Sequence, residues 1–252
     1  MLDKYPKVRP PMSDELAAIY VSYYKENRGG NTLATSIAQK MDSWLHRQVA
    51  KDVSSERTHK ETLEVGGGTL NQLQYEPEVG PYDIVEPFKE LYEGSGLLGR
   101  VRNAYSDIGE IPENQRYDRI TSIATFEHIC NLPEVIAKTG MLLKEQGSLR
   151  VSIPSEGTFL WALGWKLTTG PEFRIKYGLD YGALMRFEHV NTAQKIEDLL
   201  CYFFKGIKSS VFGLTKGISF YQYFECTHPD LERCRAYLQR VDSLKDKNTY
   251  VE

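Results

Sequence analysis

The chain has 252 residues, 41% of them hydrophobic and 26% charged, which is ordinary for a soluble globular protein of one domain, or of one domain with a small cap. Its formal net charge of −3 gives no bulk electrostatic attraction to nucleic acid or to an anionic membrane. No window is apolar over the length of a membrane span, and no apolar signal-peptide core lies near the start.

The cysteine pattern indicates a reducing environment. The four cysteines, Cys130, Cys201, Cys226 and Cys234, form no C-x-x-C pair. We therefore expect reduced thiols in a cytoplasmic protein.

The segment before the first strand, residues 1–60, is predicted to be an arm followed by a helical cap. Prolines among basic residues favour an extended arm over residues 1–12, because proline removes a helix donor. Ser13 is a suitable N-cap for a helix over residues 14–27. Apolar residues at helical spacing predict a second helix over residues 33–51. We expect the two helices to cover a functional site.

The main functional signal lies between Thr62 and Pro87. An apolar run over residues 63–65 predicts a buried strand, and three glycines follow it directly. A second buried strand is predicted over residues 82–85 and ends at Glu86. Strand, glycine turn, helix, strand and acid is the order of a nucleotide-binding βαβ unit. The glycines let the backbone approach a ligand, and the acid can accept both hydroxyls of a ribose.

Two ligands use this layout, and neighbouring residues favour one of them. A dinucleotide site has the pattern G-x-G-x-x-G, but the third glycine position falls on Asn71. Glu64 lies just before the turn, where a carboxylate repels a pyrophosphate and attracts a cation. S-adenosylmethionine carries an ammonium and a sulfonium, so Glu64 favours this cofactor. A glycine turn without any ligand is the alternative.

The run from Leu63 to Gly68, LEVGGG, resembles motif I of class I S-adenosylmethionine-dependent methyltransferases, whose pattern is apolar-acid-apolar-G-x-G-x-G. Leu70 replaces the usual third glycine, which indicates a differently pitched first helix.

Further along the chain, a helix is predicted over residues 88–92 and a third strand over residues 100–105. A fourth strand over residues 117–124 is followed by TFEHI, and an apolar helix ends in MLLKEQG at residues 141–147. This arrangement resembles motif IV of the same family. A fifth strand is predicted over residues 149–153.

Residues 155–190 fit no strand of such a sheet and interleave aromatic with basic residues, so we expect an inserted lid. A helix over residues 193–204 and strands over residues 207–214 and 218–226 follow. The resemblance implies a Rossmann-like α/β fold: a seven-stranded, mostly parallel sheet with helices on both faces and a final antiparallel hairpin. The expected core is residues 61–252, including the lid.

The resemblance also implies the cofactor site. Glu86 is expected to bind the ribose, and Asp107 the adenine amino group, although a lone loop aspartate is as often a solvated turn residue. One N-terminal tyrosine is expected to close over the methionine end. The expected cofactor contacts are Tyr24, Glu64, Gly66, Gly67, Gly68, Glu86, Pro87, Asp107, Ile108, Ala124, Thr125 and His128.

Methyl transfer to an alcohol requires removal of a proton, for which a neutral histidine is a suitable base. His128, at the end of the fourth strand, and His189, after the lid, are the candidates; each is also consistent with a packed histidine. The histidines are scattered along the sequence without metal-ligand spacing, so no metal site is expected. Cations expected to bind an anionic acceptor are Lys25, Arg28, Arg174 and Arg186.

The sequence therefore predicts a methyltransferase acting on a small molecule, such as a nucleotide-linked sugar or a phosphorylated precursor of a polysaccharide or natural product. The sequence does not distinguish methylation of an oxygen atom from methylation of a nitrogen atom. A catalytically inactive cofactor-binding or regulatory protein with the same fold is the alternative. A dehydrogenase is disfavoured by Asn71 and Glu64.

Overall fold

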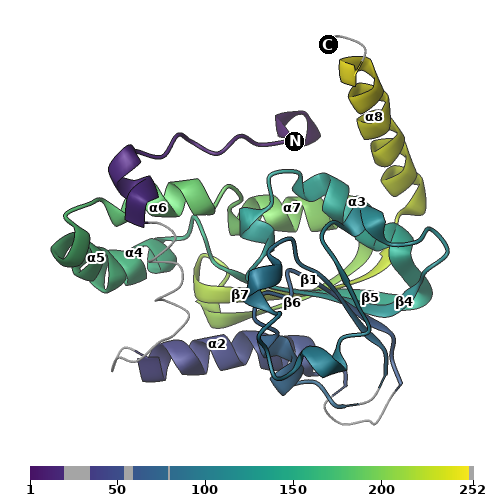
Figure 1. Ribbon diagram of the computed structural model, residues 1–252, viewed down its shortest axis with the longest axis horizontal. Helices are drawn as coiled ribbons and strands as arrows, with labels where there is room; N and C mark the ends of the chain where they lie inside the picture. Colours follow the sequence, from purple (N-terminus) through teal and green to yellow (C-terminus); the bar gives the residue numbers. More distant parts are fainter. Residues whose placement is uncertain (20–34, 54–58, 79, 250–252) are drawn as a thin grey trace.

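The computed structural model (Figure 1) describes residues 1–19, 35–53, 59–78 and 80–249. Seven strands form one mixed sheet in the order β3-β2-β1-β4-β5-β7-β6. Strands β1 to β5 are parallel to one another, whereas β7 is antiparallel to both β5 and β6. The strands are β1 (Thr62–Val65), β2 (Tyr82–Val85), β3 (Asn103–Tyr105), β4 (Tyr117–Ile123), β5 (Leu143–Pro154), β6 (Phe204–Thr215) and β7 (Ile218–Pro229). The predicted Rossmann-like α/β fold with its closing hairpin is confirmed.

The connections on the β1 side of the sheet are shorter than predicted. Between β1 and β2 the chain forms only a 3-10 helix, η2 (Asn71–Gln74), and the helix expected over residues 88–92 is likewise a 3-10 turn, η3 (Lys89–Leu91). Leu70 precedes η2 with φ 65°, and its side chain is fully buried against Leu73. A leucine buried at the third-glycine position therefore fixes a tight turn instead of beginning a long helix.

Helices cover one face of the sheet with an apolar layer. The helices α3 (Leu132–Leu142) and α7 (Ala193–Phe203) lie on this face, and α8 (Leu231–Thr249) packs against α3 (Figure 1). Thr192 caps α7, since its hydroxyl accepts the backbone N–H of Lys195 at 3.4 Å. The main buried core includes Leu63, Ile120, Phe126, Leu149, Val151, Ile196, Phe203 and Phe224.

The opposite face of the sheet is covered by α2 (Thr35–Ala50) (Figure 1). Leu45 and Val49 of this helix pack against Ile123 of β4 and Tyr223 of β7. The sequence predicted this helix as part of a cap over the site. It is instead a layer of the core, because its apolar stripe is buried against the sheet.

Beneath α2 the sheet carries buried charges. Arg119 of β4 is fully buried, and its Nη1 lies 2.6 Å from Glu76 Oε2. Arg150 of β5 donates to Glu225 of β7. Asp52 Oδ1 lies 3.2 Å from Arg119 Nη2 and 3.1 Å from Arg150 Nε. Each buried arginine therefore has a carboxylate partner, as burial of a charge requires.

The predicted lid consists of three helices at one end of the molecule, α4 (Phe159–Leu167), α5 (Thr169–Tyr177) and α6 (Tyr181–Glu188) (Figure 1). Leu16, from the helical segment 14–19, packs with Phe173 and Leu184 of the lid. The helical segment 14–19 thus packs on the lid.

Three predicted contact residues, Tyr24, Lys25 and Arg28, lie outside the described residues. In the described ranges, no helix combines the length and apolarity needed to cross a membrane.

Candidate functional site

The carboxyl ends of β1 and β4 meet at the glycine turn. Gly66 has φ 81° and Gly68 has φ 49°, conformations that side chains with a Cβ rarely adopt. A Cβ at Gly66 would lie 2.2 Å from Thr125 Oγ1, so only glycine lets the turn pack directly on the segment after β4. Gly67 packs closely on Ile84, since a Cβ at Gly67 would lie 3.1 Å from the Cβ of Ile84.

Glu86 closes the turn from the end of β2. Its Oε2 accepts the backbone N–H of Gly68 at 2.8 Å, and its Oε1 accepts the N–H of Phe88 at 3.0 Å. The carboxylate is 7% exposed. It is therefore held at the sheet edge by two charge-assisted hydrogen bonds, each oxygen having a second lone pair for a ligand hydroxyl.

Glu64 lies one layer deeper than the sequence suggested. It is buried within β1, and its Oε2 accepts the hydroxyl of Tyr82 at 2.9 Å. Burial raises the pKa of Glu64 to about 8, and nearby Glu76 adds to this increase. A neutral, hydrogen-bonded carboxyl favours a structural role, and a direct cofactor contact from Glu64 stays a prediction.

Exposed residues surround the turn. Ala124 is exposed at the end of β4 with φ 47°, a strained backbone that is typical of functional sites. Pro87 is exposed, and the neighbouring Phe88 ring is 63% exposed, although the sequence analysis did not select it. Asp107 is exposed and accepts the N–H of Gly109 at 2.7 Å, while Ile108 beside it is buried. Asp107 is thus a turn residue here, and its contact with adenine stays a prediction.

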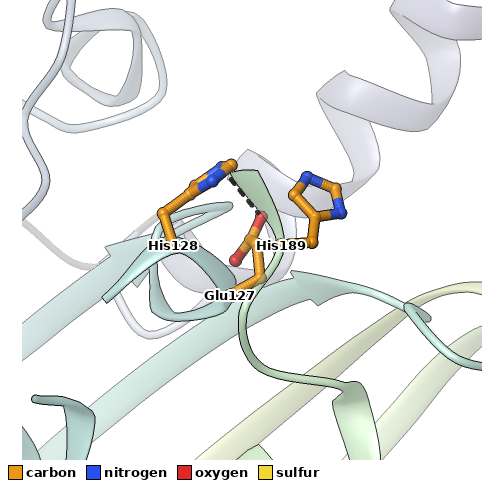
Figure 2. Close-up of side chains that lie close together, drawn as sticks. All are labelled: Glu127, His128 and His189. Carbon is orange, nitrogen blue, oxygen red and sulfur yellow. Dashed lines mark ion pairs between the residues drawn. The ribbon is translucent and has the colours of Figure 1, made fainter. Parts of the chain in front are cut away.

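The two candidate histidines lie together, on either side of the Glu127 carboxylate (Figure 2). The rings of His128 and His189 have centroids 4.9 Å apart, and His128 Nε2 lies 3.7 Å from Glu127 Oε1. Burial raises the pKa of Glu127 to about 7. Spacing along the chain predicted no metal site, because 60 residues separate the two histidines. The structure nevertheless groups one carboxylate and two imidazoles.

Fixed acceptors orient both imidazole rings. His128 Nδ1 lies 3.0 Å from the Glu188 carbonyl oxygen, and His189 Nδ1 lies 2.7 Å from Glu156 Oε2. Burial lowers the pKa of His189, but its hydrogen bond to Glu156 and the surrounding carboxylates outweigh that effect, so the pKa is raised. Trp161 Nε1 donates to the same oxygen of Glu156 at 2.6 Å.

The N-terminal arm ties these segments together. Arg9 donates to the carbonyl oxygens of Phe187 at 2.6 Å and of His128 at 2.7 Å. The hydroxyl of Tyr5 donates to Asn191 Oδ1 at 2.8 Å. The basic arm therefore holds the end of the lid beside the end of β4.

In a comparison with protein families, residues 33–203 match the family described as "Methyltransferase domain". The chain belongs to the class I S-adenosylmethionine-dependent methyltransferase family. The family's methyl donor is S-adenosylmethionine. A sequence search among curated proteins finds no match.

Solved methyltransferases share the fold. One is an S-adenosylmethionine-dependent, possible histamine N-methyltransferase from Thermotoga maritima, with a TM-score of 0.54 and 14% identity, covering 86% of this chain and 99% of that one. Another is the plantazolicin methyltransferase BpumL in complex with a triazolic desmethylPZN analog and SAH, with a TM-score of 0.57 and 11% identity, covering 85% of this chain and 95% of that one. At these identities the similarity shows the fold alone.

The described edge of this methyltransferase fits the donor. A nucleoside ribose needs hydrogen-bond acceptors, which the Glu86 carboxylate supplies, and close backbone approach, which Gly66 and Gly68 permit. The exposed Phe88 ring next to Glu86 offers an apolar surface for a base.

The lid cations of the methyltransferase differ in their surroundings. Arg174 lines a cavity of about 680 Å³ within the lid, together with Trp165 and Tyr181. Arg186 is 69% exposed and pairs with Asp180 at 3.4 Å.

Proposed function

We propose that this chain is an active methyltransferase that transfers the methyl group of S-adenosylmethionine to an oxygen or nitrogen atom of a small, anionic acceptor. A nucleotide-linked sugar or a phosphorylated precursor of a polysaccharide or natural product is the acceptor class we favour. The observation that carries the proposal is the pairing of His128 and His189 beside the glycine turn and at the end of the lid.

The residues of the turn would bind and orient the donor. Glu86 would accept the two ribose hydroxyls, and the backbone from Gly66 to Gly68 would face the nucleoside. Pro87, Ile108 and Asp107 would surround the base, with Asp107 accepting from its amino group. The bound donor supplies a methyl group on a positively charged sulfur.

The residues after β4 would position the acceptor. Methyl transfer is an in-line displacement, so the acceptor atom, the methyl carbon and the sulfur must be aligned. Ala124 and Thr125 lie between the turn and the histidine pair, so a methyl group transferred there would lie close to both. His128 and His189 would interact with the acceptor atom as its proton leaves.

The lid would enclose the acceptor. Its aromatic side chains and the cation of Arg174 suit a ring that carries a phosphate or a carboxylate. The plantazolicin methyltransferase, which has a similar fold, is described in complex with a triazolic desmethylPZN analog, which supports an acceptor with aromatic rings.

Binding and turnover measurements test the proposal. Calorimetric titration should show binding of S-adenosylhomocysteine and none of NAD. Incubation with S-adenosylmethionine and a panel of nucleotide sugars, followed by mass spectrometry, should give a product heavier by one methylene. Binding of NAD without binding of S-adenosylhomocysteine would contradict the proposal, and donor binding without turnover on any acceptor would favour the inactive alternative.

A further inference from the structure

The cluster of Glu127, His128 and His189 has the composition of a metal site. One ligand atom from each residue lies within 4.8 Å of the others. Two imidazole nitrogens and one carboxylate oxygen form a ligand set that divalent transition ions bind. Ligand atoms of a tetrahedral zinc ion are about 3.4 Å apart when each bond is about 2.1 Å. Glu127 Oε1 and His128 Nε2, 3.7 Å apart, are already near that separation.

The hydrogen bonds of both histidines leave the correct nitrogen for a metal. A carbonyl oxygen only accepts, so His128 Nδ1 carries the proton that it donates to Glu188. Glu156 Oε2 likewise accepts from His189 Nδ1. In both rings Nε2 is therefore the nitrogen without a proton. Metal-binding histidines are usually oriented in this way, with the second nitrogen donating to a carbonyl or a carboxylate.

Glu127 supplies an independent observation. The residue is 1% exposed, and its Oε2 has no hydrogen-bond partner. An unpaired carboxylate oxygen in the interior is costly and requires an explanation. A cation bound by both carboxylate oxygens would give Oε2 a partner, and Figure 2 shows the Glu127 carboxylate between the two rings.

We propose that Glu127, His128 and His189 bind one divalent transition-metal ion, of the class of Zn²⁺, Mn²⁺, Co²⁺ or Fe²⁺, and that the acceptor oxygen completes its coordination. Mg²⁺ and Ca²⁺ are disfavoured because they prefer oxygen ligands alone. The second half of this proposal rests on the proposed methyltransferase function, whereas metal binding itself does not.

The ion would change how the proton is removed. A metal lowers the pKa of a bound hydroxyl, so the acceptor releases its proton to solvent near neutral pH. An electron pair of that oxygen then forms a bond to the methyl carbon, and the carbon–sulfur bond breaks with its electron pair moving to sulfur. The products are a methyl ether and the neutral thioether S-adenosylhomocysteine. The histidines would act as ligands in this scheme, and no protein base is required.

The first experiment measures metal binding by the full chain. After dialysis against EDTA, the protein is titrated with Zn²⁺ and separately with Mn²⁺, and the bound metal is counted by mass spectrometry. We expect one equivalent of ion, bound about 10–100-fold more weakly by Glu156→Gln, because Glu156 only orients His189. Glu127→Gln and His189→Gln, which remove a ligand, should weaken binding further. His228→Gln is the matched control, since His228 is an exposed histidine on β7 whose Nδ1 lies 3.0 Å from Thr227 Oγ1.

Two outcomes overturn the inference. One is the absence of stoichiometric metal binding by a protein that still binds S-adenosylhomocysteine, which would leave the methyltransferase proposal intact. The other is an equal loss of metal affinity in His228→Gln and Glu127→Gln. Thermal melting of each variant checks that it is folded, and the isosteric Glu127→Gln variant should melt no lower than the wild-type protein.

S-adenosylhomocysteine binding separates the two proposals. If stoichiometric metal binding is lost in Glu127→Gln while the wild-type protein binds no S-adenosylhomocysteine, the metal site stands and the proposed function fails. If both bind, restoring activity to the EDTA-treated enzyme with Zn²⁺ or Mn²⁺, but not with Mg²⁺, confirms the role of the ion.

Discussion

Two regions of the molecule bury charged side chains, and they do so in different ways. Under α2, Arg119 and Arg150 lie among the carboxylates of Asp52, Glu76 and Glu225, and each arginine has a carboxylate within 3.2 Å. At the carboxyl edge of the sheet, Glu127 is as deeply buried but keeps one oxygen without a partner, and the groups facing it are imidazoles that donate elsewhere.

The difference follows from what each region must do. A buried ion pair that serves the fold needs its charges matched within the protein, because any unmatched charge costs several kcal/mol. A ligand site must leave some polar or charged groups without a protein partner, so that the bound ligand can be that partner. Both regions contain buried atoms without a hydrogen-bond partner, Asp52 Oδ1 and Arg119 Nε under α2 and Glu127 Oε2 at the edge. The candidate site differs in the groups that face its carboxylate, which are imidazoles instead of arginines.

The largest effect is expected from a variant that removes an ion pair under α2. Arg119→Ala should lower the free energy of unfolding by about 3–5 kcal/mol, because it leaves Glu76 buried without its partner. Urea denaturation measures this loss. Arg116→Ala is the control, since Arg116 is exposed and bonds only backbone carbonyls of its own loop, and it should change stability by about 0.5 kcal/mol or less. Equal losses in the two variants would show that the buried pair is not needed.

Glu64 sharpens the comparison, because it lies between the two regions. Its pKa of about 8 in the folded protein exceeds the ordinary value of 4.5. The folded state therefore holds a proton that the unfolded chain releases, and this stabilisation is lost as the pH rises from about 4.5 through 8. Glu64→Gln cannot ionise but keeps an acceptor for Tyr82, so it should be more stable than the wild-type protein at pH 8.5.

The size of this gain should depend on pH. One pKa unit corresponds to about 1.4 kcal/mol, so the gain should reach a few kcal/mol at pH 8.5 and be much smaller at pH 5. Melting temperatures at the two pH values measure it. A difference between variant and wild type that does not change with pH would mean that Glu64 is ionised at both.

Replacement of Glu86 tests the candidate site at the carboxyl edge of the sheet. Glu86→Ala removes the acceptor of the Gly68 and Phe88 N–H groups and, in our proposal, of the ribose hydroxyls. Each charge-assisted hydrogen bond contributes about 1.5–3 kcal/mol, so affinity for S-adenosylhomocysteine should fall at least about tenfold in calorimetric titration. Glu90→Ala, an exposed acid on the next turn, should leave it unchanged. An unaltered dissociation constant for Glu86→Ala would place the ribose elsewhere.

The sequence predicted the fold best where its signals are local. The glycine turn, the acid that ends β2 and the succession of strands along the chain all follow from short runs of residues, and the fold confirms where they lie. The final hairpin was equally readable, because turn signals act over a few positions.

What the sequence could not give depends on contacts between distant segments. The residues near Glu127 in the sequence do not indicate that His189 lies beside it. The position of His189 depends on how the intervening lid helices pack. The same holds for α2, whose apolar stripe fits either a cap or a sheet face. Asp52, Arg119 and Arg150 were not selected at all, since their pairing arises only when α2 covers the sheet.

The smallest expected effect concerns the lid, where the two candidate cations differ in pairing just as the two regions do. Asp180, which itself lines the lid cavity, compensates the charge of Arg186. Arg174 lines the same cavity together with Lys166 and two aromatic rings. Uridine diphosphate serves as an anionic probe of this cavity. Arg174→Ala should weaken its binding about three- to tenfold, the amount expected for one partly exposed ionic contact, with affinity for S-adenosylhomocysteine unchanged. Arg186→Ala should have a smaller effect, because its removal also frees the carboxylate of Asp180. Equal losses in the two variants would show that the probe senses only the net charge of the lid, and the assignment of Arg174 to the acceptor would then be wrong.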